Sequence, residues 1–150
     1  MIGENRAAEG ETRPQLLLVE DDDAVRRSIQ LLLQARGFDV RAYAAGPALL
    51  ADPRVTQARC LVSDYFIQGS DGLEILERLR ARGWDGPAVL ITAFGSPDLE
   101  RRARAQGYSA VLRKPFREHV LTDTVARLVS QSRSGATQRN NDDRPAPDPL

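Results

Sequence analysis

The chain has 150 residues, of which 41% are hydrophobic and 28% are charged, and its 21 basic residues balance its 21 acidic ones. This composition is typical of a soluble domain, and the zero net charge argues against a general attraction to nucleic acid or to an anionic membrane. No apolar run approaches the ~20 residues of a membrane-spanning helix, and the N-terminus lacks the apolar core of a secretory signal. We therefore expect a cytoplasmic protein without a membrane segment.

The first half of the chain alternates short apolar runs with helical patterns. Residues 16–19 form an apolar run that is too short for a helix and predicts a strand. The following pattern places Val25, Ile29 and Leu33 on one helical face and ends at Gly37. Residues 38–42 predict a weak strand, and 47–50 predict a short helix. Residues 60–63 predict a third strand.

The second half repeats this alternation. Asp71 and Glu74 form a capping-box pattern that predicts the start of a helix. Residues 88–91 predict a fourth strand, and Ser96 followed by Pro97 predicts the next helix start. Residues 110–112 predict a fifth strand and 117–130 a last helix. Five such units with nearly continuous apolar strands indicate an α/β fold, a parallel sheet covered by helices on both faces.

Both ends of the chain are polar. The last twenty residues contain almost no large apolar side chain and include three prolines near the end, so they cannot bury enough surface to offset the entropy of ordering. We expect residues 1–14 and 132–150 to be disordered and the folded domain to comprise residues 15–131.

Polar side chains follow four of the five predicted strands. Glu20 and Asp21 follow the first, Asp64 the third, Thr92 the fourth and Lys114 the fifth. The carboxyl ends of parallel strands meet at one edge, where ligands bind. Carboxylates ~4 Å apart repel by about 1 kcal/mol per pair in water and about 4 at an effective dielectric constant near 20.

A hard divalent cation such as Mg²⁺ would neutralise this repulsion. One carboxylate could then form an aspartyl phosphate. In that chemistry Lys114 would offset charge on the transferred group, and Thr92 could donate a hydrogen bond to one of its oxygens.

Four segments, LLLVEDDDAVRR, LVSDYFIQGSDGLEIL, VLITAFGS and VLRKPF, resemble the motif blocks of response-regulator receiver domains of two-component systems. They occur in the family's order, and the resemblance covers residues 16 to about 130. It implies a flavodoxin-like (βα)5 three-layer sandwich with strand order 2-1-3-4-5. It also implies a cis peptide bond before Pro115.

The resemblance further implies roles for individual residues. Asp64 would accept a phosphoryl group from a histidine kinase or a histidine phosphotransfer protein, and Thr92 and Lys114 would contact its oxygens. Mg²⁺ would be held by Asp64, by Asp21 directly, by Glu20 mostly through water, and by the backbone carbonyl of Phe66. The domain would catalyse only its own phosphoryl transfer and dephosphorylation, so it would not be an enzyme in the usual sense.

The expected output is a change in protein–protein contacts. In the family, the surface of the fourth helix, fifth strand and fifth helix binds partners, and it is a candidate for homodimer formation here. Exposed positions among four apolar residues of the last helix are candidates for docking: Val120, Leu121, Val125 and Leu128. We expect an unidentified downstream protein and no direct binding to nucleic acid.

Two departures from the family pattern leave alternatives open. Val111 occupies the position of the usual aromatic switch, and Phe66 replaces a residue that is usually polar. A pseudo-receiver that binds partners without phosphorylation is one alternative. An aspartyl-phosphate phosphatase is another, although such enzymes usually carry a second Asp where this chain has Phe66.

Overall fold

The computed structural model describes the backbone of residues 13–143 and the side chains of residues 13–132. Its main sheet has five parallel strands: β1 (Gln15–Val19), β2 (Asp39–Tyr43), β3 (Cys60–Asp64), β6 (Ala88–Thr92) and β7 (Ala110–Arg113). The strands lie in the order β2-β1-β3-β6-β7. Numbered along the chain, this order is 2-1-3-4-5, so the predicted fold class is confirmed.

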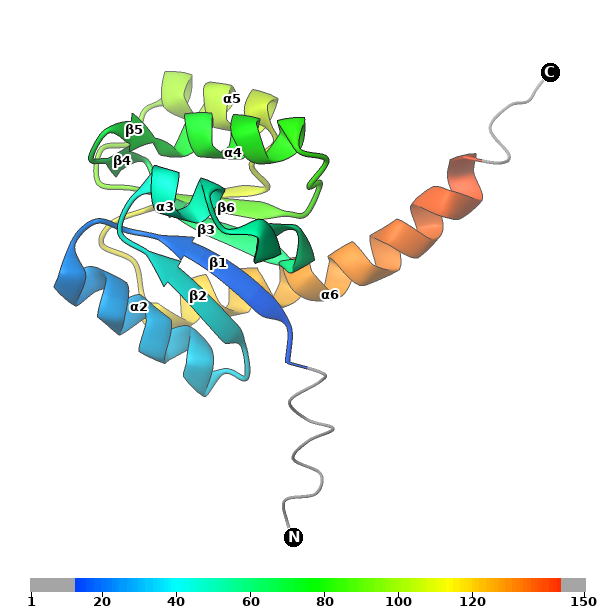
Figure 1. Cartoon of the computed structure of the whole chain (residues 1–150), viewed down its shortest axis with the longest axis horizontal. Coiled ribbons are helices and arrows are strands. Elements are labelled where there is room, and N and C mark those ends of the chain that lie inside the picture. The colour runs from blue at the N-terminus through cyan, green and yellow to red at the C-terminus, as the bar shows by residue number, and fades with distance from the viewer. Residues whose placement is uncertain (1–12, 144–150) are drawn as a thin grey trace, which may run out of the picture.

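Helices cover both faces of the sheet (Figure 1). On one face lie α2 (Asp23–Ala35) and α6 (Glu118–Asp143); on the other lie α3 (Gly46–Leu50), α4 (Gly72–Ala81) and α5 (Pro97–Gln106). Because successive strand residues point to opposite faces, each strand supplies both layers of the core. Leu17 and Leu61 pack with the helices of the second group, whereas Leu18 and Val62 pack with α2 and α6.

Three short elements escape the sequence prediction. A 3-10 turn, η1 (Pro53–Gln57), precedes β3, and a two-stranded hairpin of β4 (Phe66–Ile67) and β5 (Ser70–Asp71) follows it. The hairpin turn uses Gly69 at a φ of 82°, a backbone conformation that favours glycine. The predicted helix start is confirmed, because the Asp71 carboxylate accepts a hydrogen bond from the Glu74 backbone N–H at 2.9 Å.

The last helix differs from its prediction in length and in its buried face. The sequence pattern places its end near Ser130, whereas α6 continues to Asp143 and extends away from the sheet (Figure 1). No proline occurs between Glu118 and Pro145, so the helical hydrogen-bonding pattern can continue past Ser130. The prediction that both chain ends are disordered also covers residues 1–12 and 144–150, which lie outside the described residues, so it stays a prediction there.

Two of the four candidate docking residues on this helix are excluded. Leu121 and Val125 are fully buried against the sheet, whereas Val120 and Leu128 are half-buried and remain candidates. Helical spacing alone cannot separate the residues that face a sheet from residues that face a partner, because both sets are apolar.

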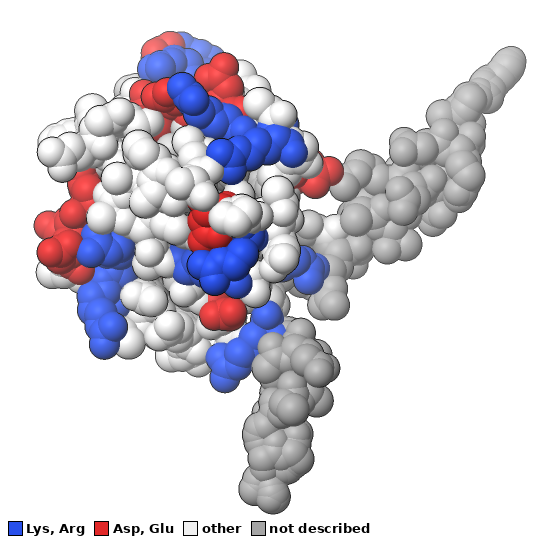
Figure 2. Space-filling view, viewed as in Figure 1, with Lys and Arg blue, Asp and Glu red and all other residues white. Residues whose placement is uncertain are grey.

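The charged surface is mixed. Figure 2 shows basic and acidic side chains next to each other on the face drawn there, with no continuous basic patch. Within residues 13–143, no helix is both long enough and apolar enough to cross a membrane.

Candidate functional site

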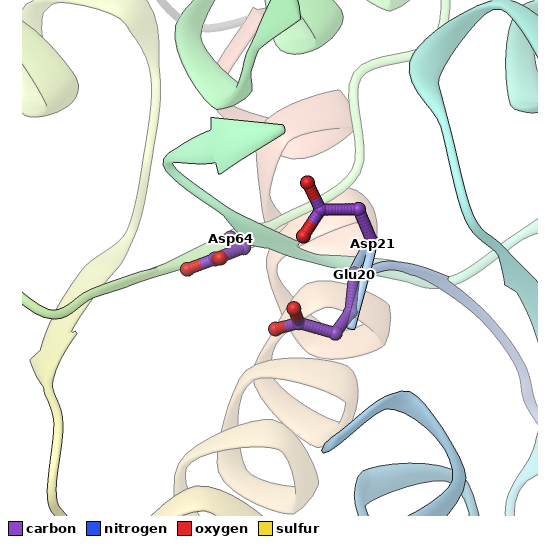
Figure 3. Close-up of side chains that lie close together, drawn as sticks. All are labelled: Glu20, Asp21 and Asp64. Carbon is purple, nitrogen blue, oxygen red and sulfur yellow. The ribbon is translucent and has the colours of Figure 1, made fainter. Parts of the chain in front are cut away.

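Three carboxylates converge at the carboxyl edge of the sheet. β1 and β3 are neighbours, with Val19 opposite Ser63, so Glu20 and Asp64 follow at the same level. Together with Asp21 they place one carboxylate oxygen each within 4.8 Å of the others, and the three side chains lie close together at this edge (Figure 3). Glu20 and Asp64 are buried, at 2% and 9% exposure, whereas Asp21 is exposed.

Lys114 brings a positive charge to the same edge. Its ammonium nitrogen lies 3.4 Å from Glu20 Oε1 and 3.6 Å from Asp64 Oδ1. It is the only lysine in the chain, whose other basic residues are arginines. The backbone fixes its position, because the Lys114 N–H donates to the Thr92 carbonyl at 2.8 Å. The Lys114–Pro115 peptide bond is cis, as the resemblance implies.

The charge of this cluster is only partly compensated. Burial raises the pKa of Asp64, and the neighbouring Asp21 raises it further, while Lys114 opposes both effects. Burial also raises the pKa of Glu20, opposed by the hydrogen bond from the Asp22 N–H and by Lys114. Three acids facing one amine therefore favour an additional cation.

The donor set fits Mg²⁺. All three side-chain ligands are carboxylate oxygens, which hard cations prefer, and the exposed side of the cluster at Asp21 leaves room for retained water. Among the described residues, this potential metal-binding group consists of carboxylates alone, without His or Cys, and this composition argues against zinc.

Thr92 reaches the same edge as Asp64. It is the last residue of β6, and its neighbour Ile91 lies opposite Asp64 in the sheet. The Thr92 side chain is buried, and its hydroxyl oxygen accepts a hydrogen bond from the Phe94 N–H at 3.1 Å. This bond uses a lone pair of the hydroxyl oxygen and not the hydroxyl proton.

Phe66 lies in the hairpin that follows Asp64. Its ring packs edge-on against Tyr65, with 4.8 Å between the centroids, and is 62% exposed. This hairpin contacts the acidic cluster directly, because the Gln68 N–H donates to Asp21 Oδ2 at 3.0 Å. The segment that carries the expected Phe66 carbonyl ligand thus lies beside the carboxylates.

Val111 leaves space where a larger side chain would pack. Together with Gly95, Leu99 and Arg113 it lines a surface cavity of about 250 Å³ between β7 and the start of α5. The Arg113 guanidinium donates to the Gly95 carbonyl at 2.9 Å and so ties β7 to the loop after Thr92.

Sequence reasoning missed two aromatic features, one beside the site and one behind it. Phe94, two residues after Thr92, is 77% exposed, so exposed rings follow both β3 and β6. Tyr108 is buried and its hydroxyl donates to the Gly72 carbonyl at 2.7 Å. The sequence does not indicate the exposure of Phe94 or the burial of Tyr108, because an aromatic residue in a loop or before a strand can be either exposed or buried.

Comparison with known proteins agrees with this geometry. The chain is 30% identical over 125 residues to the transcriptional regulatory protein FixJ of Bradyrhizobium diazoefficiens, covering 83% of this chain and 61% of that protein. It is 32% identical over 127 residues to FixJ of Azorhizobium caulinodans, covering 85% and 59%. The chain thus spans about three-fifths of the length of these relatives.

Solved structures share the fold. The signal receiver domain of a putative LuxO repressor protein from Vibrio parahaemolyticus superimposes with a TM-score of 0.77 at 20% identity, covering 83% of this chain and 96% of that one. Residues 16–126 match the family profile described as response regulator receiver domain. The chain therefore belongs to the response regulator receiver domain family.

Proposed function

We propose that this domain accepts a phosphoryl group on Asp64 and thereby switches its contacts with other proteins. The observation that carries the proposal is the convergence of Glu20, Asp21 and Asp64 with the Lys114 ammonium at one edge of the sheet. A receiver domain is not a conventional enzyme. Its chemistry is a single transfer onto its own side chain.

The transfer forms one bond and breaks another. A carboxylate oxygen of Asp64 bonds to the phosphorus while the phosphorus–nitrogen bond of a donor phosphohistidine breaks, and the leaving imidazole takes up a proton. Lys114 offsets negative charge on the phosphoryl oxygens, and the Thr92 hydroxyl donates a hydrogen bond to one of them. Both residues act by positioning the phosphoryl group and neutralising its charge, which are the main contributions of a protein to phosphoryl transfer.

Mg²⁺ would be held by Asp64, Asp21, Glu20 and the Phe66 carbonyl. When bound, it supplies positive charge that lowers the repulsion between the carboxylates and the incoming phosphoryl oxygens. The raised pKa values of Asp64 and Glu20 support this assignment, because both carboxylates are poorly compensated without a cation.

The partners follow from the family. The donor would be a histidine kinase or a histidine phosphotransfer protein in the cytoplasm. The downstream protein is unidentified, and a homodimer through α5, β7 and α6 would be one way to transmit the signal. The FixJ relatives are transcriptional regulatory proteins. We retain residues 15–131 as the proposed domain, close to the matched range 16–126.

Incubation with Mg²⁺ and acetyl phosphate, followed by intact-mass measurement, tests the proposal. The wild-type chain should gain one phosphoryl group, and Asp64→Asn should gain none. Asp98→Asn is the matched control, because Asp98 is an exposed acid of α5 whose partner is Arg101. Equal labelling of wild type and Asp64→Asn would remove Asp64 as the acceptor.

The same experiment separates the alternatives. A wild-type chain that stays unlabelled would favour an interaction module that works without phosphorylation. Continuous release of phosphate from small phosphoesters would instead favour a phosphatase.

A further inference from the structure

The Tyr108 side chain connects the turn before β7 to the first residue of α4. Its ring is 3% exposed and packs in the core cluster between the sheet and α4 and α5. Its hydroxyl donates to the Gly72 carbonyl at 2.7 Å. Burial raises the pKa of Tyr108, so the hydroxyl keeps its proton and remains a donor at any physiological pH.

Gly72 is held against the backbone of the phosphoacceptor. Its N–H donates to the Tyr65 carbonyl at 2.9 Å. A Cβ atom added at Gly72 would lie 2.8 Å from the Asp64 carbonyl oxygen and 2.7 Å from Leu90 Cδ1, so no space separates the two backbones. The Asp64 carbonyl also accepts a hydrogen bond from the Ser63 hydroxyl at 2.9 Å.

The position of Gly72 therefore sets the position of the whole segment 64–72. Asp64 is the first residue of this segment. Near its other end, Asp71 pairs with Phe66 in the hairpin. The hairpin carries the Phe66 carbonyl and touches Asp21 through the Gln68 N–H. A shift of Gly72 would move the acceptor carboxylate relative to Lys114 and would move the hairpin relative to Asp21.

We propose that Tyr108 is a positioning residue for phosphoryl acceptance: its hydroxyl holds the Gly72 carbonyl and thereby fixes the segment that carries Asp64 and the Phe66 carbonyl. The inference rests on the proposed function. Tyr108 contacts neither the acceptor carboxylate nor the proposed metal ligands, and it acts through α4. Transfer rates are sensitive to such positioning, since a displacement of about 1 Å can cost roughly 100-fold.

The test compares two single-residue variants of the 150-residue chain. Tyr108→Phe removes only the hydroxyl. Trp84→Phe removes a donor bond of the same kind, because the Trp84 indole N–H donates to the Ala58 carbonyl at 2.8 Å and the side chain is 4% exposed in the same core cluster. Trp84 follows the opposite end of α4, about 15 Å along the helix from Gly72.

Two measurements distinguish a positioning role from a purely structural one. The first is the rate of acyl-phosphate formation at saturating acetyl phosphate and Mg²⁺, followed by quenched intact mass under conditions where urea titration shows both variants to be folded. We expect a loss of roughly tenfold for Tyr108→Phe and less than about twofold for Trp84→Phe. The second is amide hydrogen exchange of residues 64–72 without Mg²⁺ or donor, which should become faster only in Tyr108→Phe.

The outcomes are separable. Equal saturating rates for the two variants, with a labelled wild-type chain, would overturn this inference and leave the proposed function intact. Unchanged exchange of residues 64–72 in Tyr108→Phe would overturn it as well. A wild-type chain that accepts no phosphoryl group would overturn the proposed function and, with it, this role of Tyr108.

Discussion

Lys114 and Glu20, which are 94 residues apart in the sequence, meet with the ammonium nitrogen 3.4 Å from Oε1. This contact joins the loop after β1 to the loop after β7. The same nitrogen lies 3.6 Å from Asp64 Oδ1. Within residues 13–132, the amine is the only cation for which the structure gives ion pairs to the side-chain carboxylates of Glu20 and Asp64, and its removal should have measurable consequences.

Lys114→Met should make the stability of the metal-free protein more dependent on pH. The pKa values of Asp64 and Glu20 in the folded chain lie above their ordinary values. Stability associated with a raised pKa is present below the unfolded pKa, near 4, and is lost as pH rises through the folded pKa. Without Lys114 both pKa values rise further, so this loss grows.

We expect Lys114→Met to lose about 1–2 kcal/mol more stability than wild type between pH 5 and pH 7.5, since one pKa unit corresponds to about 1.4 kcal/mol. Urea unfolding in EDTA at the two pH values measures the difference. Arg101→Met, which breaks an exposed ion pair with Asp98, is the control and should show no such change. An identical pH dependence in Lys114→Met and wild type would contradict the electrostatic account.

Millimolar Mg²⁺ should stabilise the wild-type chain and have little effect on Asp21→Asn. A ligand that binds only the folded state stabilises it by about 2.7 kcal/mol at 100 times its dissociation constant. Asp21 is the exposed member of the cluster and one of its three carboxylates. The urea midpoint with and without Mg²⁺ measures the effect, and Asp98→Asn should behave like wild type. An equal shift in Asp21→Asn would place the metal elsewhere.

Cys60 should react with thiol reagents only when the chain unfolds. Its side chain is completely buried in β3, and burial raises the pKa of the thiol to about 12. The reactive thiolate is therefore nearly absent at pH 8, and reagents cannot reach the sulfur. Because Cys60 is the only cysteine, a single chromogenic assay reports it. Rapid labelling in the absence of urea would show that β3 is less protected than its burial indicates.

Leu121→Ala should destabilise the domain by about 2–5 kcal/mol, as expected for a fully buried leucine. Leu121 packs with Leu18 and Val62 in the core between the sheet and α6. Leu31→Ala makes the same change at a position that is 49% exposed and should cost far less. Urea unfolding compares the two. Equal small effects would return Leu121 to the set of candidate docking residues.

Much of the arrangement is encoded locally. Apolar runs of three to five residues between helical patterns are typical of buried strands, and the polar residues that follow such runs then lie at the carboxyl edge of a parallel sheet. The sequence alone therefore predicts that five polar residues lie together at this edge: Glu20, Asp21, Asp64, Thr92 and Lys114. The start of α4 could also be predicted from the sequence, because the Asp71 cap depends on residues only three positions apart.

Contacts between distant segments could not be predicted from local sequence patterns. The hairpin of β4 and β5 has two residues per strand, too few for a periodic pattern, and whether Leu121 faces the sheet or a partner depends on which elements pack around α6. The bond from Tyr108 to Gly72 joins residues 36 positions apart. The sequence by itself determined which chemical groups gather at the sheet edge, because strand periodicity and chain direction are local properties. Only the tertiary structure decided which side chains hold those groups in place, because packing joins segments whose local patterns carry no information about each other.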